Sequence, residues 1–323
     1  MKILVTGAAG FIGSNLAKYL LDNNYDVVGI DNFNDYYNPK IKEFNIQSFK
    51  ENPKFKLYRV DISDRETLKM VFAENPNMDA VVHLAAWAGV TYSVENPYIY
   101  VKDNVLGTTN LTDFSLEYGA NNFIFASTSA VYGDNQPPFT EDMDTSHSNA
   151  PYPATKKASE VLLYAISKNT DLNATIFRFF NPLGPNLRPD MALPKLIRSA
   201  EYGKVFELWQ DPKSSARDYT YINDMMKAIE YVINHPNKYE IMNLGNSNPI
   251  SLQDMLNTVE KVTGKKIKTI ENYLPGQMKE TLADISKARK IIGYNPKTTL
   301  EKMVKIYYEW FAQQPEWYRK EQY

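Results

Sequence analysis

Hydrophobic residues in the first half of the chain fall into short runs that alternate with longer amphipathic stretches. The runs are rich in Val, Ile and Phe and show little polar alternation, which is typical of strands in a sheet covered on both faces. Strands are predicted at 2–6, 26–31, 55–62, 79–86, 122–127 and 173–180, and helices at 13–23, 64–74, 97–118 and 154–169. This alternation predicts a doubly wound parallel α/β sheet of the Rossmann type.

The pattern changes after Asn181, where proline-rich loops are followed by a predicted helix near 193–202 and by smaller strand and helix units. Ser251 is the predicted N-cap of a helix over 252–263, and Gly264 is predicted to end it. We therefore expect two domains. Residues 1–180 form the first, to which roughly 218–246 return. Residues 181–323 mainly form a smaller, partly interleaved α/β domain.

Composition narrows the function classes. The net charge is −2 with acidic and basic residues interleaved, which argues against nucleic-acid and membrane-surface binding. There is no cysteine, and His83, His147 and His235 are too far apart for metal-ligand spacing, so no metal is expected. The apolar run before Gly7 is too short for a signal peptide, and no apolar segment reaches the roughly 18 residues that span a bilayer. A cytoplasmic location is expected.

A glycine motif, Gly7-Ala8-Ala9-Gly10-Phe11-Ile12-Gly13, lies between the first predicted strand and the first predicted helix. Glycines at these places allow a tight turn, close approach of backbone N–H groups to a pyrophosphate, and packing of helix against strand. Asp31 ends the second strand, where a carboxylate accepts hydrogen bonds from a ribose 2′-hydroxyl and repels a 2′-phosphate. The motif therefore predicts NAD rather than NADP. Asp61 and Ile62 either flank the adenine or simply end the third strand.

A second candidate motif is Tyr152-x-x-x-Lys156, whose spacing places both side chains on one face of a helix. The lysine charge can lower the pKa of the tyrosine, so that the phenolate takes a proton from an alcohol. The same spacing recurs at Tyr36/Lys40, Tyr98/Lys102 and Tyr164/Lys168. Only Tyr152 and Lys156 open a helix shortly after a strand end, at the edge where α/β sheets bind ligands. Thr128, between Ser127 and Ser129, is the predicted hydroxyl that binds the substrate oxygen there.

Further motifs accompany these two along nearly the whole chain: His83-Leu84-Ala85-Ala86, Thr128-Ser129-Ala130-Val131-Tyr132-Gly133 and Arg217-Asp218-Tyr219-Thr220-Tyr221. In this combination the chain resembles the extended short-chain dehydrogenase/reductase family, and within it the nucleotide-sugar 4-epimerases. The resemblance implies an NAD that is reduced and reoxidised within one turnover. It implies that Tyr152 deprotonates the sugar 4-hydroxyl. It also implies that the 4-keto sugar rotates about its diphosphate link and takes the hydride back on its other face.

The resemblance also implies a set of site residues. The predicted catalytic residues are Tyr152, Lys156 and Thr128. The predicted cofactor contacts are Gly7, Gly10, Phe11, Ile12, Gly13, Asp31, Asp61, Ile62, Leu84, Ala85, Ala86, Tyr152 and Lys156. The predicted substrate contacts are Thr128, Ser129, Asn181, Arg188, Arg217 and Gln277. Dehydratases and decarboxylases of the family carry an acidic residue just after the threonine, where this chain has Ser129 and Ala130. Return of the hydride is therefore the expected outcome.

The stretch Asn32-Phe33-Asn34-Asp35-Tyr36-Tyr37, together with Ala88-Gly89-Val90 and Arg188-Pro189-Asp190-Met191-Ala192, resembles the UDP-glucuronate 4-epimerases. Oxidation of glucuronate at C4 gives a β-keto acid, which loses carbon dioxide if its carboxylate rotates freely. A planar guanidinium can hold that carboxylate with two hydrogen bonds. The resemblance assigns this task to Arg188 with Thr128 and Ser129. The alternative is that Arg188 serves the nucleotide phosphates or a rigid surface loop.

Four positions depart from the glucuronate pattern and keep other substrates open. Asn181 replaces a threonine and is more like the UDP-glucose/galactose type, Trp87 and Thr91 replace Gln and Arg, and Gln277 replaces an aspartate that meets the uridine ribose. The alternatives are a UDP-glucose/UDP-galactose or N-acetylhexosamine 4-epimerase, and a non-catalytic NAD-binding scaffold. A homodimer through the helices at 97–118 and 154–169 is implied by the resemblance.

Overall fold

The computed structural model describes residues 1–272 and 280–321. The chain divides into two compact units. The first unit comprises Met1–Asn135, Glu141–Phe179 and Met226–Met242, and the second comprises Gln136–Thr140, Phe180–Met225 and Asn243–Tyr323. The chain therefore contributes one short segment to the second unit at Gln136–Thr140, leaves the first unit after Phe179 and re-enters it at Met226–Met242.

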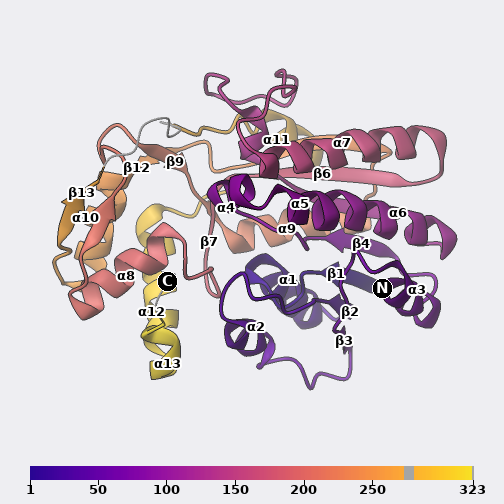
Figure 1. Ribbon diagram of the computed structural model, residues 1–323, viewed down its shortest axis with the longest axis horizontal. Coiled ribbons are helices and arrows are strands. Elements are labelled where there is room, and N and C mark those ends of the chain that lie inside the picture. Colours follow the sequence, from indigo (N-terminus) through magenta and orange to yellow (C-terminus); the bar gives the residue numbers. More distant parts are fainter. Residues whose placement is uncertain (273–279, 322–323) are drawn as a thin grey trace. The chain divides into compact units, whose positions relative to one another are not determined.

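A seven-stranded sheet in the order β11-β6-β5-β4-β1-β2-β3 organises the first unit (Figure 1). Val5 pairs in parallel register with Gly29 on one side and Val82 on the other. The strands are β1 (Lys2–Thr6), β2 (Asp26–Ile30), β3 (Phe55–Tyr58), β4 (Ala80–His83), β5 (Asn122–Thr128), β6 (Asn173–Phe179) and β11 (Tyr239–Leu244). The predicted parallel Rossmann-type sheet is confirmed. Its carboxyl edge carries the ends of β1, β4 and β5.

Helices cover both faces of this sheet. One hydrophobic cluster joins the sheet to α3, α6 and α7 through residues such as Phe72, Phe114 and Leu163. On the other face, Tyr19 of α1 donates a hydrogen bond to Glu230 of α9. The helical elements of this part of the chain are α1 (Phe11–Asp22), α2 (Pro39–Ile46), α3 (Arg65–Glu74), α4 (Val90–Glu95), α5 (Pro97–Tyr100), η1 (Val101–Leu106), α6 (Gly107–Glu117), η2 (Ser129–Tyr132), α7 (Pro151–Asn169) and α9 (Ile222–Asn234).

Two strands end three or four residues earlier than the sequence predicts. The strand predicted at 79–86 ends at His83, because the N–H groups of Leu84 and Ala85 both donate to the Thr6 side chain. The strand predicted at 55–62 ends at Tyr58, and Asp61 then turns the chain by accepting two hydrogen bonds from Ser63. In both places side-chain contacts with the following loop replace the strand pairing.

The helix predicted at 97–118 is three pieces, because η1 interrupts it with π-helical turns between α5 and α6. Asp103 and Asn104 of η1 are buried and bond Trp87, in the loop after β4. These contacts explain the interruption. The sequence gives no sign of it, because no proline lies inside the helix. Helices α2 and α4 were not predicted.

The second unit contains small two-stranded sheets and the remaining helices. Ser251 caps α10 through Asp254 N–H and Gly264 ends the helix, as predicted. The strands are β7 (Pro182–Leu183), β8 (Phe206–Leu208), β9 (Ala216–Asp218), β10 (Thr220–Tyr221), β12 (Pro249–Ser251) and β13 (Thr269–Glu271). The helices are α8 (Ala192–Tyr202), α10 (Leu252–Thr263), α11 (Ser286–Ile292), α12 (Leu300–Ala312) and α13 (Glu316–Arg319). Within residues 1–272 and 280–321, no helix combines the length and the hydropathy needed to cross a membrane.

Candidate functional site

The glycine motif forms the turn between β1 and α1. Gly7 has a φ of +68°, and a Cβ at Gly13 would lie 1.9 Å from the Gly7 carbonyl oxygen, so both positions require glycine. Gly10 is the N-cap of α1, and the first turn of that helix carries no acidic residue. The N–H groups at the start of α1 therefore face no carboxylate from that turn, which suits a pyrophosphate.

Asp31 lies buried immediately after β2, beside this turn. Its Oδ2 accepts a hydrogen bond from Ala9 N–H at 3.1 Å, and its Oδ1 accepts one from Phe33 N–H at 2.8 Å. The Lys42 ammonium is 3.7 Å from Oδ1. The carboxylate is thus fixed next to the glycine motif, and the residues present fit a dinucleotide with a free 2′-hydroxyl.

The other predicted cofactor residues lie at the ends of β3 and β4. Burial opposes the charged form of Asp61, but hydrogen bonds from Ser63 outweigh it and the pKa of the carboxyl is lowered. The Ile62 side chain is part of the hydrophobic core. Leu84 and Ala85 are tied to β1 by their bonds to Thr6. Ala86 lies in the loop between β4 and α4.

Helix α7 begins at Pro151, and Lys156 lies one turn after Tyr152. Lys156 is buried, and its ammonium donates a 2.8 Å hydrogen bond to the Ala126 carbonyl on β5. Burial lowers the pKa of Lys156 to about 7, while the charge of Glu160 acts in the opposite direction. The lysine is therefore anchored at the carboxyl end of β5 in an apolar setting, as chemistry with a nearby tyrosine requires.

The competing Tyr/Lys pairs occupy other surroundings. Tyr98 is 80% exposed and Tyr164 is 50% exposed, which fits surface roles. The Tyr36 ring packs edge-on against Trp87. By contrast, Tyr152 lies with its ring 6.1 Å from that of Tyr100 at the base of α7. Location on the fold therefore distinguishes this pair from the others.

Thr128 ends β5 and opens η2 as its N-cap, with its hydroxyl oxygen accepting a hydrogen bond from Ala130 N–H. Ser129 follows it and is buried. The hydroxyl oxygen of Thr128 accepts this bond, so its proton remains available for donation. Thr128 and Ser129 thus lie on the same strand end to which Ala126 anchors Lys156.

Sequence reasoning missed a buried acid in this region. Glu160 accepts hydrogen bonds from Ser127 and from Arg178 of β6. Two signals could have found it. Glu160 lies four residues after Lys156, on the same helix face, and Arg178 is a lone charge within an apolar strand.

Trp87, one of the departures from the glucuronate pattern, is buried in the first unit. Its indole N–H donates a 2.5 Å hydrogen bond to Asp103, and its ring stacks on Tyr92 at 5.7 Å. Burial, followed by the charge of Asp61, raises the pKa of Asp103. The tryptophan therefore fixes the loop after β4 against η1. Thr91 is exposed on α4.

Arg188 lies in the proline-rich loop of the second unit. Its Nε and Nη2 donate to the two carboxylate oxygens of Asp190 at 3.1 and 2.9 Å. The loop is further fixed by turns in which Leu187 N–H donates to Gly184 O and Met191 N–H to Arg188 O. The guanidinium is thus held by a carboxylate two residues along the chain.

The remaining predicted substrate residues also belong to the second unit. Asn181 has a φ of +30°, and its side-chain amide donates to the Asp218 carbonyl. Arg217 is partly buried, which lowers its pKa, and its guanidinium donates to the Ala216 carbonyl. Gln277 lies outside the described residues. No group of three His, Asp or Glu side chains placed to hold a metal occurs in the described part of the chain.

Comparisons with known proteins give this architecture a family. Residues 3–245 match the NAD dependent epimerase/dehydratase family. The chain is 38% identical to the UDP-glucuronate 4-epimerase of Thermodesulfobacterium geofontis over 309 residues, covering 95% of each protein. An uncharacterized protein of Methanocaldococcus jannaschii is 38% identical over 322 residues, covering 98% of each. The chain belongs to the NAD-dependent epimerase/dehydratase family.

Solved structures agree with this assignment. UDP-glucuronic acid 4-epimerase from Bacillus cereus, in complex with UDP-glucuronic acid and NAD, superposes with a TM-score of 0.90 at 35% identity, covering 97% of this chain and 99% of that chain. UDP-glucose 4-epimerase from Thermotoga maritima, with UDP-glucose, gives a TM-score of 0.87 at 28% identity, with the same coverage. The predicted family, the epimerase class and NAD as the cofactor are confirmed, and the relatives support 4-epimerisation of UDP-glucuronate.

Proposed function

We propose that this protein interconverts UDP-glucuronate and UDP-galacturonate by NAD-dependent epimerisation at C4. The observation that carries the proposal is Lys156, buried against the end of β5 one helical turn after Tyr152. A lysine desolvated in this way can favour the phenolate form of a neighbouring tyrosine. The relatives at 35–38% identity direct the proposal to the glucuronate substrate.

In this proposal the first unit binds NAD and supplies the acid–base chemistry. Tyr152 takes the proton of the sugar 4-hydroxyl and later returns it, and Lys156 favours its phenolate form. Thr128 donates a hydrogen bond to the same substrate oxygen. Bound NAD would supply the acceptor for the C4 hydride and the source for its return. Asp31 and the turn at Gly7–Gly13 would hold its adenosine and pyrophosphate.

The second unit, in this proposal, recognises the nucleotide sugar. Arg188 binds the C6 carboxylate and prevents it from turning out of plane in the 4-keto intermediate, where loss of carbon dioxide would follow. Asp190 supports this role because it fixes the guanidinium through two hydrogen bonds. Arg217 and Asn181 would contact the rest of the nucleotide sugar, as would Gln277.

A neutral-sugar epimerase is the second candidate. Asn181, held by Asp218 and with positive φ, is the residue that favours it, because asparagine there resembles the UDP-glucose/galactose type. A non-catalytic scaffold has less support, since the chain retains both Tyr152 and Lys156.

The test is incubation of the purified protein with a panel of UDP-sugars and identification of the products by NMR. UDP-glucuronate should give UDP-galacturonate faster than UDP-glucose gives UDP-galactose. If UDP-glucose or an N-acetylhexosamine form is the better substrate, the second candidate replaces the first. If no sugar is turned over while NAD remains bound, the scaffold is the correct assignment.

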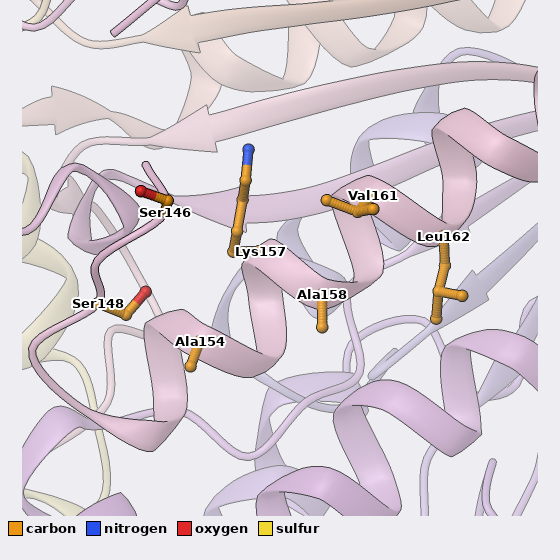
Figure 2. A pocket seen from close by; sticks show the side chains of 7 residues that line it. All are labelled: Ser146, Ser148, Ala154, Lys157, Ala158, Val161 and Leu162. Carbon is orange, nitrogen blue, oxygen red and sulfur yellow. The ribbon is translucent and has the colours of Figure 1, made fainter. Parts of the chain in front are cut away.

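We propose further that the protein is a homodimer in the cytoplasm, where NAD and UDP-sugars are available. Helix α7 presents Ala154, Ala158 and Leu162 along one face, beside a hollow of about 690 Å³ whose wall includes Ser148 (Figure 2). Helix α7 and the neighbouring α5 and η1 also carry exposed apolar side chains: Val161, Tyr164, Tyr98, Val101 and Leu106. Such an exposed apolar surface fits a contact with the same helices of a second copy of the chain.

The association can be tested by light scattering after gel filtration. Ala158→Arg places a charge in the middle of this face and should give monomers. Ser286→Arg, at the exposed start of α11 in the second unit, is the matched control and should leave the dimer intact. A wild-type monomer at micromolar concentration would reject the dimer.

A further inference from the structure

An ion pair lies completely buried beside the end of β5. Arg178 of β6 donates from Nε to Glu160 Oε1 at 3.0 Å and from Nη2 to Oε2 at 2.8 Å, and each side chain is 1% exposed. The hydroxyl of Ser127 on β5 also donates to Oε1, at 2.6 Å. One carboxylate of α7 is therefore bonded to two strands of the sheet.

This carboxylate is surrounded by charged and titratable groups from several elements. The Lys157 ammonium is 3.6 Å from Glu160 Oε2 on the same helix. Tyr239 of β11 donates its hydroxyl to the Glu160 backbone carbonyl. The Arg178 guanidinium lies 4.9 Å from the centre of the Tyr132 ring of η2. Burial opposes the charged form of Arg178, but its bonds to Glu160 prevail and its pKa is raised.

A buried pair of this kind is weak evidence of stability. Removing two charges from water is costly, and well-packed apolar residues in the same place would stabilise the fold as well or better. Its place in the molecule suggests a role in the reaction, because Ser127 directly precedes Thr128 and Glu160 lies one helical turn after Lys156.

Lys156 has few other charged neighbours. On its own helix it interacts with Glu160, and on β4 with His83, whose pKa is lowered by burial and then by the lysine charge. From β5 it meets the Ala126 carbonyl and the face of the Phe125 ring, 4.7 Å away. Glu160 therefore supplies the negative charge that favours the ammonium form.

We propose that Glu160 is a positioning residue for the epimerisation. Its carboxylate, balanced by Arg178, holds Ser127 and with it the end of β5, and its charge sets the electrostatic potential at Lys156. This inference rests on the proposed roles of Tyr152 and Lys156.

The sign of the effect follows from the charges. The active form needs Tyr152 as the phenolate and Lys156 as the ammonium, so the rate has an acid limb and an alkaline limb. Glu160→Gln removes a negative charge and leaves the positive charge of Arg178 unbalanced. The loss of this one negative charge favours loss of a proton from Tyr152 and from Lys156. Both limbs should move to lower pH, by about one unit.

The experiment measures kcat for UDP-glucuronate against pH in the wild type, Glu160→Gln and the double variant E160Q/R178Q. The double variant removes both charges of the pair and does not leave Arg178 as an unpaired buried charge, so it should fold even if Glu160→Gln does not. The limbs of its pH profile should be shifted from those of the wild type by at most half the shift seen in Glu160→Gln. Circular dichroism and the content of bound NAD check that each variant is folded.

Ser127→Ala is the matched control for the hydrogen bond, because it keeps both charges. It should lower kcat several-fold with the two limbs at their wild-type pH. If Glu160→Gln and the double variant lose activity while their limbs stay at the wild-type pH, Glu160 has only a structural role and the inference fails. The inference fails as well if the double variant is shifted as far as Glu160→Gln.

A Tyr152→Phe variant in the same series separates this failure from that of the proposed function. If Tyr152→Phe retains full activity, the assignment of the base is wrong and the pH profiles report another group. If Tyr152→Phe is inactive and the limbs of Glu160→Gln do not move, only the role of Glu160 is rejected.

Discussion

Two cations are central to the proposed chemistry, and they differ in burial and in the groups that hold them. Lys156, in the first unit, is buried against the sheet and bonded to a backbone carbonyl. Arg188, in the second unit, has a side chain that is 19% exposed and is paired with Asp190 in its own loop. One cation is separated from water, whereas the other is held in a fixed orientation near it.

This difference matches two different tasks. Burial brings the pKa of Lys156 to about 7, so its charge can respond to changes in the neighbouring tyrosine. An arginine stays charged at any working pH, and its useful property is the planar fork that matches a carboxylate. The comparison therefore predicts that the first unit is sensitive to loss of one ionisable oxygen, and the second to loss of planar geometry.

The largest effect is expected at Tyr152. Tyr152→Phe removes only the ionisable oxygen, and loss of a general base commonly lowers turnover by about 10²–10⁴-fold. NAD binding and the folded state should be retained. The measurement is kcat for UDP-glucuronate together with the content of bound NAD.

Tyr98→Phe and Tyr164→Phe are the matched controls, because each removes the same atom from a Tyr/Lys pair of identical spacing. Both side chains are at least half exposed and should tolerate the change. Equal damage from either one in a folded protein would mean that the wrong pair was chosen.

The choice of Tyr152 shows what the sequence could predict. Runs of Val, Ile and Phe placed the strands, and their order located the carboxyl edge, so the pair at that edge could be selected. The ends of β3 and β4 were set too far along the chain, because they depend on the side chains of Thr6 and Asp61, which no local pattern shows.

The partners within the site were harder to predict. Glu160 lies in an amphipathic helix, where an acidic residue ordinarily faces water, and only the strand residue Arg178 shows that it is buried. The π-helical turns of η1 likewise depend on Trp87, in another segment. Arg188 and Asp190 are only two residues apart in the sequence. Even so, only the structure shows that both carboxylate oxygens of Asp190 accept hydrogen bonds from Arg188.

The second largest effect concerns Arg188. A charge-assisted pair with the substrate carboxylate contributes roughly 1.5–3 kcal/mol, or about ten- to a hundredfold in binding. Arg188→Lys should lose most of this, because an ammonium lacks the planar fork. The variant should also release carbon dioxide and a 4-keto pentose nucleotide. The measurement is the ratio of UDP-glucuronate to UDP-glucose turnover, with by-products followed by NMR.

Arg289→Lys, on an exposed position of α11, is the matched control and should change neither substrate. A parallel fall for UDP-glucuronate and UDP-glucose in Arg188→Lys would assign the arginine to the diphosphate or to the loop.

A smaller effect is expected for the choice of cofactor. The Asp31 carboxylate would face the 2′-phosphate of NADP with like charge, although Lys42 at 3.7 Å offsets part of that charge. We expect the apoprotein to bind NAD about tenfold more tightly than NADP at low salt. Asp31→Asn should narrow the difference, and Asp26→Asn at the exposed start of β2 should not. Equal affinities in the wild type would reject the assignment of Asp31.

The smallest effect sharpens the comparison between the two cations. Asp190→Asn keeps the shape of the side chain but leaves one acceptor oxygen in place of two, so the guanidinium of Arg188 loses one of its two bonds to this residue. The loss of one partly exposed hydrogen bond should raise KM for UDP-glucuronate by about threefold, with kcat nearly unchanged. KM for UDP-glucose should stay at its wild-type value, because that sugar has no carboxylate. A fall in KM for UDP-glucuronate would show that Asp190 competes with the substrate for the fork. In that case Asp190 holds the partly exposed Arg188 back until substrate arrives, whereas the buried Lys156 is always in place.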